Sequence, residues 1–161
     1  MAELIPGVRN SARALILRDG YLLLLRKEGD VYALPGGGQD TGESLEGALQ
    51  RECREEIDTD VLSPSLVQVC DYFKLKRTEP PTRRHQVDFL FRATVPDDYT
   101  PRNGASPDKR QLDVLWVEVD VLARLAFSPY YLASVLPRLI STGNAAAGPL
   151  YAGVYHDSPD S

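Results

Sequence analysis

The sequence predicts an α/β fold in which a mixed β-sheet is covered by helices on both faces. Apolar segments of β-rich composition occur before and after one amphipathic helical segment, and a second segment with helical spacing follows them. The 161 residues are 43% hydrophobic, which is enough for one substantial core. We therefore expect a single domain over residues 1–142 and a flexible C-terminal tail over residues 143–161.

The N-terminal part is predicted to form a β-hairpin. Residues 8–17 become apolar toward their end, residues 21–25 are apolar, and Asp19-Gly20 between them is typical of a hairpin turn. A short apolar segment, residues 31–34, then leads into a proline and three glycines. Because proline lacks a backbone donor and glycine leaves the backbone loosely constrained, we expect residues 35–38 to form a loop.

The central helix is predicted to begin after Ser44, which stands at an N-cap position. Apolar residues recur behind it at spacings of three and four, as in an amphipathic helix: Leu45, Ala48, Leu49 and Cys53. Asp58 stands near the expected end of the helix. Aspartate tolerates the left-handed backbone conformation better than most residues, so the helix can terminate there.

Further strands and a closing helix follow the central helix. Residues 66–75 and 87–95 are predicted strands, separated by the polar segment 76–86, and a loop over 96–110 leads to a strand at 112–119. Residues 121–125 and 129–140 have helical spacing, with a stripe formed by Leu132, Val135, Leu136 and Leu139. Pro129 suits a first helical turn, whereas Pro137 is expected to kink or shorten the helix.

Three glutamates of the central helix are predicted to share one side. Glu55 and Glu56 follow Glu52 by three and four residues, and Arg51 can reach Glu55 at i+4. One basic partner for three acids leaves negative charge uncompensated. The surplus negative charge favours binding of a divalent cation. The candidate ligands are carboxylate oxygens, with no histidine or cysteine at a metal-binding spacing, and such ligands favour Mg²⁺ or Mn²⁺, which also bind phosphate oxygens of substrates. The alternative is a solvated helix whose charges form only surface pairs.

The spacing of these charges resembles a known motif. Five residues separate Gly37 from Glu43, seven separate Glu43 from Arg51-Glu52, and two separate Arg51-Glu52 from Glu55-Glu56. This pattern resembles the Nudix box. The chain departs from the family pattern where Cys53 replaces an aliphatic residue, Asp58 a glycine and Thr59 an aliphatic residue. The resemblance implies a MutT-like pyrophosphohydrolase of the Nudix hydrolase family, folded as an α/β/α sandwich with a central mixed β-sheet.

The resemblance also implies roles for individual residues. The glutamates bind divalent cations, one of them can act as general base, Arg51 orients a carboxylate, and a carbonyl of Gly36 or Gly37 adds a ligand. Glu43 is either a further ligand or a first-turn acid that complements the helix dipole. We expect the metal ligands to be Gly37, Glu52, Glu55 and Glu56. We expect the catalytic residues to be Glu52, Arg51 and Glu55.

Substrate-binding residues and further acids are predicted outside the motif. Arg83 and Arg84, next to His85, suit phosphate by charge, and Tyr32 and Tyr72 can stack a base. The alternatives are solvated loop charges and core aromatic residues. Family members often take a base or an extra ligand from another loop, and the candidates, which are otherwise solvent-facing strand residues, are Asp88 and Asp113.

The resemblance implies hydrolysis of a phosphoanhydride bond in a nucleoside diphosphate linked to another moiety, such as a nucleoside triphosphate or ADP-ribose. The alternatives are a non-catalytic nucleotide-binding sensor or regulator and, on the same fold, an isomerase with a catalytic cysteine. Subgroups that cleave ADP-ribose or dinucleoside polyphosphates tend to carry Pro or Tyr about fifteen to seventeen residues past the box. This chain has Lys74, Leu75 and Lys76 there, which disfavours both subgroups.

Composition limits the compartment and the partners. With 18 basic and 23 acidic residues the formal charge is −5, which does not favour nucleic acid, and we expect no DNA-binding domain. Two cysteines without a CxxC motif indicate a reduced, cytoplasmic protein. The sequence has no signal-peptide pattern and no run of eighteen apolar residues, so we expect no membrane segment. The resemblance makes a homodimer possible.

Overall fold

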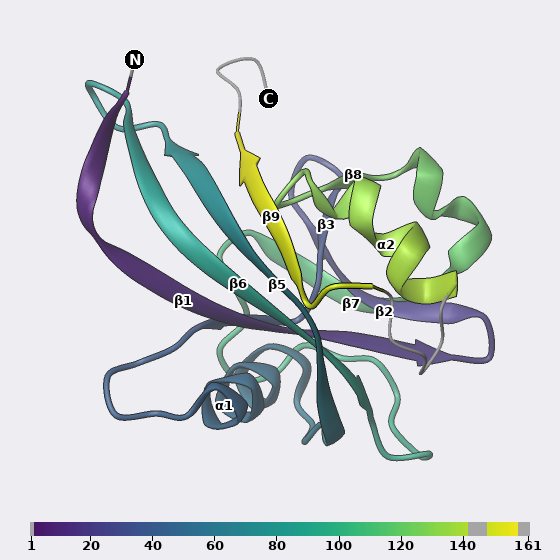
Figure 1. The fold of residues 1–161 in the computed structure, drawn as a ribbon. Coiled ribbons are helices and arrows are strands. Elements are labelled where there is room, and N and C mark those ends of the chain that lie inside the picture. Colours follow the sequence, from purple (N-terminus) through teal and green to yellow (C-terminus); the bar gives the residue numbers. More distant parts are fainter. Residues whose placement is uncertain (1, 142–147, 158–161) are drawn as a thin grey trace.

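A run of four leucines shows how the sheet is built. Residues 22–25 of β2 (Tyr21–Lys27) are all fully buried, although side chains of a strand alternate between its two faces. Leu23 and Leu25 pack with α1 (Leu45–Ile57) in one core cluster, and Leu22 and Leu24 pack with α2 (Leu132–Ser141) in the other. The sheet therefore has helices on both faces, as predicted (Figure 1).

The computed structural model describes residues 2–141 and 148–157. Its strands run in the order β8-β3-β2-β1-β6-β5-β9, with β4 also paired to β1 and β7 to β2. The sheet is mixed, because β1 runs parallel to β6 and antiparallel to β2 and β4. The remaining bounds are β1 (Glu3–Arg18), β3 (Val31–Ala33), β4 (Gly36–Gly38), β5 (Leu62–Lys76), β6 (Thr82–Thr94), β7 (Gln111–Glu118), a 3₁₀ turn η1 (Val119–Arg124), β8 (Ala126–Phe127) and β9 (Tyr151–His156).

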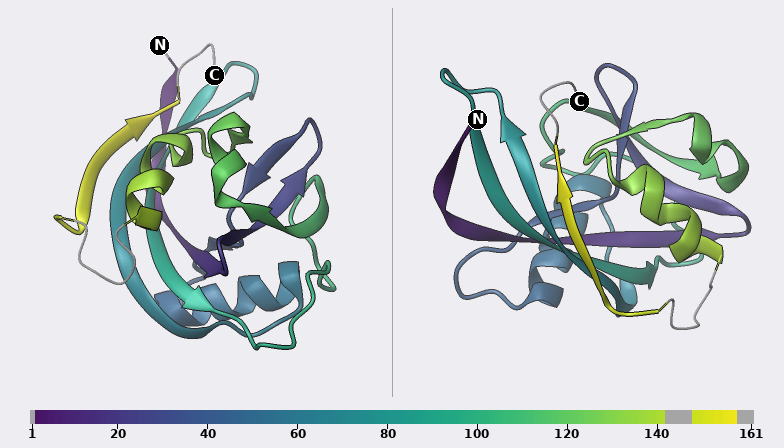
Figure 2. Two further views of the ribbon diagram at one scale, coloured as in Figure 1. Left: turned by 90° about the vertical axis from the view of Figure 1, so that its right-hand side faces the viewer. Right: turned by 45° about the horizontal axis from the view of Figure 1, so that its top comes forward.

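The predicted hairpin is correct at its turn but not along its length. Asp19 and Gly20 both have positive φ, 51° and 82°, as a tight hairpin turn requires. Only Leu17–Leu22 and Arg18–Tyr21 pair across it, however, and most of β1 instead pairs in parallel with β6. The long β1 therefore joins the two parts of the curled sheet (Figure 2).

The predicted glycine loop is partly wrong. Pro35 precedes a three-residue strand, β4, in which Gly36, Gly37 and Gly38 pair with Arg13, Ala12 and Ser11 of β1. Gly36 has a φ of +132°, and a Cβ there would lie 2.1 Å from the carbonyl oxygen of Ala12. Only glycine permits so close an approach of the two strands, so the glycines build a strand rather than interrupt one.

Both predicted ends of the central helix are present. The Ser44 hydroxyl accepts a hydrogen bond from the Gly47 N–H at 2.9 Å, and α1 begins at the next residue. Asp58 adopts the left-handed conformation, with φ 59° and ψ 42°, and its N–H donates to the Arg54 carbonyl. The departure from the family's glycine at this position is therefore accommodated.

Strands β5 and β6 extend further than the sequence suggested. They pair antiparallel from Leu62–Thr94 to Lys76–Thr82, so the connection between them is residues 77–81 rather than 76–86. Arg83, Arg84 and His85 consequently lie within β6 and not in a loop. Cross-strand pairing outweighed the low β propensity of these charged residues.

The closing helix buries its predicted stripe of Leu132, Val135, Leu136 and Leu139. It starts after Pro129 and includes Pro137, beyond which it continues to Ser141. The other predicted helical segment is the 3₁₀ turn η1, which covers residues 119–124. No helix within the described residues is long and apolar enough to cross a membrane.

The predicted flexible tail is wrong for residues 151–156, which form β9. This strand runs parallel to β5 at the edge of the sheet, for example with Tyr155 beside Tyr72 (Figure 1). Tyr155 stacks on Tyr131, with ring centroids 4.5 Å apart, and packs against the core under α2. Of the predicted tail, residues 143–147 and 158–161 lie outside the described residues. The tyrosines and valine of β9 were a strand signal diluted by nearby glycine and alanine.

If β9 is part of the folded domain, Tyr155→Ala will lower the free energy of unfolding by about 1–3 kcal/mol, because a partly buried aromatic ring is lost. Val154→Ala on the same strand is the control, since Val154 is 50% exposed and its loss is expected to cost roughly 0.5 kcal/mol or less. Urea unfolding measures both variants. Equal, negligible effects of the two substitutions would show that β9 does not contribute to the core.

Candidate active site

Arg51 of α1 holds the carboxylates of the predicted motif together. Its Nε and Nη2 donate to the two Glu43 carboxylate oxygens at 2.8 and 2.9 Å, and Nη1 donates to Glu52 at 3.0 Å and Glu55 at 3.4 Å. Nη2 also donates to the Gly38 carbonyl at 2.9 Å, which ties α1 to β4. The hydrogen bond from Arg51, with one from the Asp40 N–H, lowers the pKa of Glu43 to about 2.

Glu56 points into the protein beneath β4. The residue is only 2% exposed, and its carboxylate accepts the Gly36 N–H at 2.8 Å. Burial raises the pKa of Glu56 to about 8, against the opposing effects of the Gly36 N–H and of Arg13. Burial also raises the pKa of Glu52, although Arg51 opposes that shift. The site therefore contains two carboxylates whose negative charge the protein compensates poorly.

Gly37 leaves space beside one of these carboxylates. A Cβ at Gly37 would lie 2.7 Å from the Glu52 carboxyl carbon and from one of its oxygens, and all three nearest atoms belong to the Glu52 side chain. The absent side chain at position 37 therefore leaves the Glu52 carboxylate open toward β4.

The donor atoms fit a hard divalent cation. Carboxylate oxygens of Glu52, Glu55 and Glu56, with the carbonyl of Gly37, form the oxygen-only set that Mg²⁺ and Mn²⁺ prefer. Among the residues that the structure describes, no three acidic, histidine or cysteine side chains already converge as a ligand cluster, and Glu52 and Glu55 contact Arg51 instead. Closing such a site requires these two carboxylates to turn from Arg51.

The loop that precedes β7 is anchored on the end of α1. The N–H groups of Gly104 and Ser106 donate to the carbonyls of Glu56 and Glu55, each at 3.0 Å, and Gln111 Nε2 donates to the Glu56 carbonyl at 2.9 Å. A Cβ at Gly104 would lie 2.3 Å from the Glu55 carbonyl oxygen, so this close approach requires glycine. The loop thereby carries residues 108–110 to the cavity described next.

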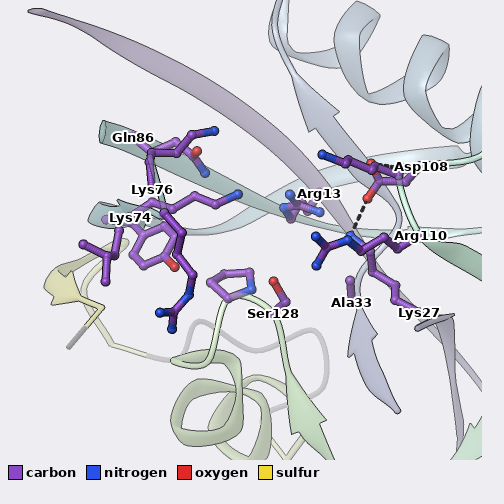
Figure 3. A pocket seen from close by; sticks show the side chains of 14 residues that line it. Arg13, Lys27, Ala33, Lys74, Lys76, Gln86, Asp108, Arg110 and Ser128 are labelled. Atoms are coloured by element: carbon purple, nitrogen blue, oxygen red, sulfur yellow. Dashed lines mark hydrogen bonds and ion pairs between the residues drawn. The ribbon is translucent and has the colours of Figure 1, made fainter. Parts of the chain in front are cut away.

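A cavity of about 590 Å³ opens on the side of the sheet toward α2, and half of the residues in its wall are basic (Figure 3). It is lined by Arg13, Lys27, Ala33, Tyr72, Lys74, Leu75, Lys76, Arg77, Gln86, Asp108, Lys109, Arg110, Ser128 and Pro129. The only acid of the lining, Asp108, pairs with Lys27 at 2.9 Å. Volume and charge suit an anionic small molecule.

Arg13 connects this cavity with the carboxylates. It lies opposite Gly36 in the pairing of β1 with β4, and Gly36 in turn donates to Glu56. Its Nη1 donates to the Leu34 carbonyl at 3.1 Å, while its buried Nε has no hydrogen-bond partner within the described residues. The acidic and basic groups thus adjoin at β4.

The structure separates the four predicted substrate residues. Tyr72 lines the basic cavity, and its hydroxyl donates to Asp157 at 2.7 Å. Tyr32 packs against the core cluster under α2 and is not part of the cavity wall. Arg83 donates to the Ala2 carbonyl at 3.0 Å, and Arg84 lines a different, open hollow beside Glu43. Both arginines pair with β5 residues of the cavity wall, Arg83 opposite Leu75 and Arg84 opposite Lys74, but neither lines the cavity itself.

The additional acids have other partners. Asp113 forms a two-point ion pair with Arg26, at 3.0 and 2.9 Å. Asp88 is fully buried, so the prediction of a solvent-facing residue is wrong for it; it accepts hydrogen bonds from Tyr131 and Gln86. His85 contacts Asp71 at 2.6 Å and stacks on Phe73.

The sequence analysis missed most of the cavity wall. Lys74 and Lys76 alternate along an otherwise apolar part of β5, and this alternation was a signal that both face the same side of the sheet. Arg13 within the apolar β1 was a second signal, because a charge in a buried strand needs a partner. The loop residues 108–110 carried no such pattern.

Comparisons with known proteins agree with this fold. The model of the NUDIX domain family matches residues 7–139. A MutT NUDIX hydrolase from Burkholderia pseudomallei is 27% identical, with a TM-score of 0.56 over 71% of this chain and 85% of that one. A MutT protein from Bacillus halodurans is 19% identical, with a TM-score of 0.66 over 94% of this chain and 92% of that one. An ADP-ribose pyrophosphatase from Streptococcus suis, also 19% identical, has a TM-score of 0.58 over 91% and 98%.

The buried Glu56 predicts a pH-dependent stability. In the unfolded chain its pKa is near 4.5, and in the folded protein about 8, so as pH rises between these values the unfolded state loses this proton first and folding becomes less favourable. In metal-free protein, Glu56→Gln will therefore be more stable than wild type by on the order of 3 kcal/mol at pH 8.5, and by much less at pH 5.

Urea unfolding in the presence of a chelator at both pH values measures this difference. Glu46→Gln is the matched control, because Glu46 is exposed on the same helix. A Glu56→Gln effect of equal size at both pH values would contradict the burial of an uncompensated carboxyl group.

Proposed function

The chain belongs to the Nudix hydrolase family, and we propose that it uses a divalent cation to hydrolyse a phosphoanhydride bond in a nucleoside diphosphate linked to another moiety. The observation that carries the proposal is the junction at β4: Arg13 of the basic cavity lies opposite Gly36, whose N–H binds the Glu56 carboxylate. An anionic substrate in the cavity thereby has its phosphates next to the acidic residues of α1.

Glu52, Glu55, Glu56 and the Gly37 carbonyl would hold Mg²⁺ or Mn²⁺. Such an ion, when bound, neutralises phosphate oxygens and makes a water more acidic. The open space at Gly37 and the poorly compensated charge on Glu52 and Glu56 support this ligand set. Because a ligating carboxyl must be deprotonated, Glu56 also makes binding of the cation favour a pH near or above 8.

The remaining roles follow from accessibility. The Glu55 side chain is 40% exposed, compared with 17% for Glu52 and 2% for the whole Glu56 residue. We therefore assign Glu55, in addition to its place in the ligand set, to accept the proton of the attacking water, whereas Glu52 and Glu56 serve the cation alone. Arg51 is a positioning residue, because it aligns Glu52 and Glu55 from one guanidinium group. Arg13, with its unpartnered Nε, binds phosphate.

In the proposed reaction the water oxygen bonds to one phosphorus atom, and the anhydride oxygen leaves with the other. Each product keeps one of the two phosphates that formed the anhydride bond. The positive charge of the cavity stabilises the negative charge that builds up on both phosphates.

Two alternatives are less well supported. A non-catalytic nucleotide sensor would not require the full set of motif glutamates, all of which are present in this chain. An isomerase of the same fold would require a reactive thiol, but both cysteines are buried. Burial raises the pKa of Cys70 to about 11 and that of Cys53 further still, so neither is a thiolate at neutral pH. The free thiols suit the reducing cytoplasm that we propose for this protein.

Wild-type protein will hydrolyse at least one member of a panel of nucleoside diphosphate derivatives in the presence of about 5–10 mM Mg²⁺ or Mn²⁺. Glu56→Gln will reduce kcat by at least about a hundredfold, and so will Glu55→Gln, because a cation ligand or the base is lost. Glu46→Gln, on the same helix, should leave the rate unchanged. Nucleotide binding that raises the melting temperature without turnover of any substrate would instead indicate the sensor.

Gly37→Ala tests the space beside Glu52. The new methyl group displaces only the Glu52 side chain, so we expect a melting temperature within about 5 °C of wild type and an affinity for Mn²⁺ at least about tenfold lower. Titration calorimetry with Mn²⁺ measures the affinity. Unchanged Mn²⁺ binding by a folded Gly37→Ala variant would rule out a cation at this place.

A further inference from the structure

The basic residues of this chain are unevenly distributed. All four lysines of the sequence, Lys27, Lys74, Lys76 and Lys109, line the one cavity, together with three of its fourteen arginines. The chain as a whole carries a formal charge of −5, so this concentration does not follow from composition. Seven basic side chains less the one acid, Asp108, leave a formal charge of +6 on the cavity wall.

The basic residues form two groups on different sides of the cavity. Lys27 and Arg110 lie on one side, close to Asp108, and Lys74 and Lys76 lie on the other, with Arg13 between them (Figure 3). Lys27 comes from β2 and Arg110 from the loop before β7, whereas Lys74 and Lys76 belong to the end of β5. Arg13 and its neighbour Gly36 connect the middle of this arrangement to the carboxylates of α1.

The two lysines of β5, Lys74 and Lys76, have little compensating charge: Asp157 attracts Lys74, but less strongly than Arg13, Lys76 and Lys27 each repel it. Lys74 is partly buried, and neither Lys74 nor Lys76 has an ion-pair partner among the described residues. Burial lowers the pKa of Lys74, and repulsion from Arg13, Lys76 and Lys27 lowers it further. The two groups are therefore close enough to repel each other, and this unfavourable interaction is relieved when an anion occupies the space between them.

The charge exceeds what a single linked diphosphate supplies. The two phosphates of a linked diphosphate carry about two negative charges, whereas each terminal phosphate adds about 1.5 to 2 more. The positive charges of Arg13, Lys27 and Arg110 are sufficient to balance the diphosphate that lies next to α1. Lys74 and Lys76 would then face a part of the substrate distant from the cleaved bond.

We propose that the substrate carries a further phosphate group besides the cleaved diphosphate, and that Lys74 and Lys76 bind this distal phosphate. The inference rests on the proposed hydrolysis and defines its substrate class. Two chemical sources can provide the group: a phosphate monoester on a sugar, or an additional phosphate in the anhydride chain. Both present the same terminal, doubly charged oxygens to lysine.

Two matched substrate pairs test the proposal, and each pair differs by one phosphate. ADP-ribose is compared with its 2′-phosphate derivative, and ADP with ATP, at fixed ionic strength and with Mg²⁺. We expect kcat/KM to be at least about tenfold higher for the more highly phosphorylated member of one pair, mainly through a lower KM. A higher kcat/KM for the 2′-phosphate derivative than for ADP-ribose identifies the distal group as a phosphate monoester. A higher kcat/KM for ATP than for ADP identifies it as an additional phosphate of the anhydride chain.

Lys74→Met and Lys76→Gln will each reduce that preference by about tenfold or more, because they remove the charge that faces the distal phosphate. Arg124→Met is the control, since Arg124 is exposed on η1, lies outside the cavity and changes the net charge equally. The Glu55→Gln variant, in which turnover is blocked, provides binding constants for the same four compounds by calorimetry.

Hydrolysis of both members of each pair with equal kcat/KM overturns the inference and leaves the proposed function intact. A preference that persists in both lysine variants also overturns it, because the distal phosphate is then bound elsewhere. No hydrolysis of any compound, with no tighter binding of the phosphorylated members, overturns the proposed function and the inference together.

Discussion

The burial of the Glu56 carboxylate under the Gly36 N–H is the interaction on which the geometry of the site depends. It attaches α1 to β4, and β4 pairs with β1 only because Gly36 allows the two backbones to approach closely. This chain of contacts sets the distance between the acidic face of the helix and Arg13. A buried carboxyl with a pKa of about 8 destabilises the folded protein at neutral pH, and the cation that we propose would relieve that cost.

The charges of the molecule are separated in a way that suits phosphate chemistry. Acids gather on α1, where Arg51 contacts Glu43, Glu52 and Glu55, and basic residues gather in the adjoining cavity. Arg13 attracts Glu52 and Glu56, but burial outweighs that attraction and still raises the pKa of both carboxyl groups. In the proposed reaction, a phosphate that binds across the boundary between the two groups would contact basic side chains on one side and, through a cation, carboxylates on the other. The substrate and the cation would thereby complete the site.

Local sequence signals predicted the elements that depend on neighbouring residues. Ser44 and Asp58 marked the ends of α1, and Asp19-Gly20 marked a tight turn. Signals that depend on distant pairing failed: the glycines of residues 36–38 became a strand because β1 lies beside them, and residues 151–156 became β9 because β5 presents a free edge. The cavity was missed for the same reason, since its wall combines residues from β1, β2, β5 and a loop.

The most direct test of the account is a crystal structure with Mn²⁺ and a nucleotide analogue whose bridging anhydride oxygen is replaced by a methylene group. The account predicts anomalous density for Mn²⁺ within about 2.5 Å of carboxylate oxygens of Glu52 and Glu56, with a phosphate of the analogue contacting Arg13. A nucleotide bound in the open hollow beside Arg84, or Mn²⁺ without contact to either glutamate, would contradict the claim that the carboxylates and the basic cavity form one catalytic site.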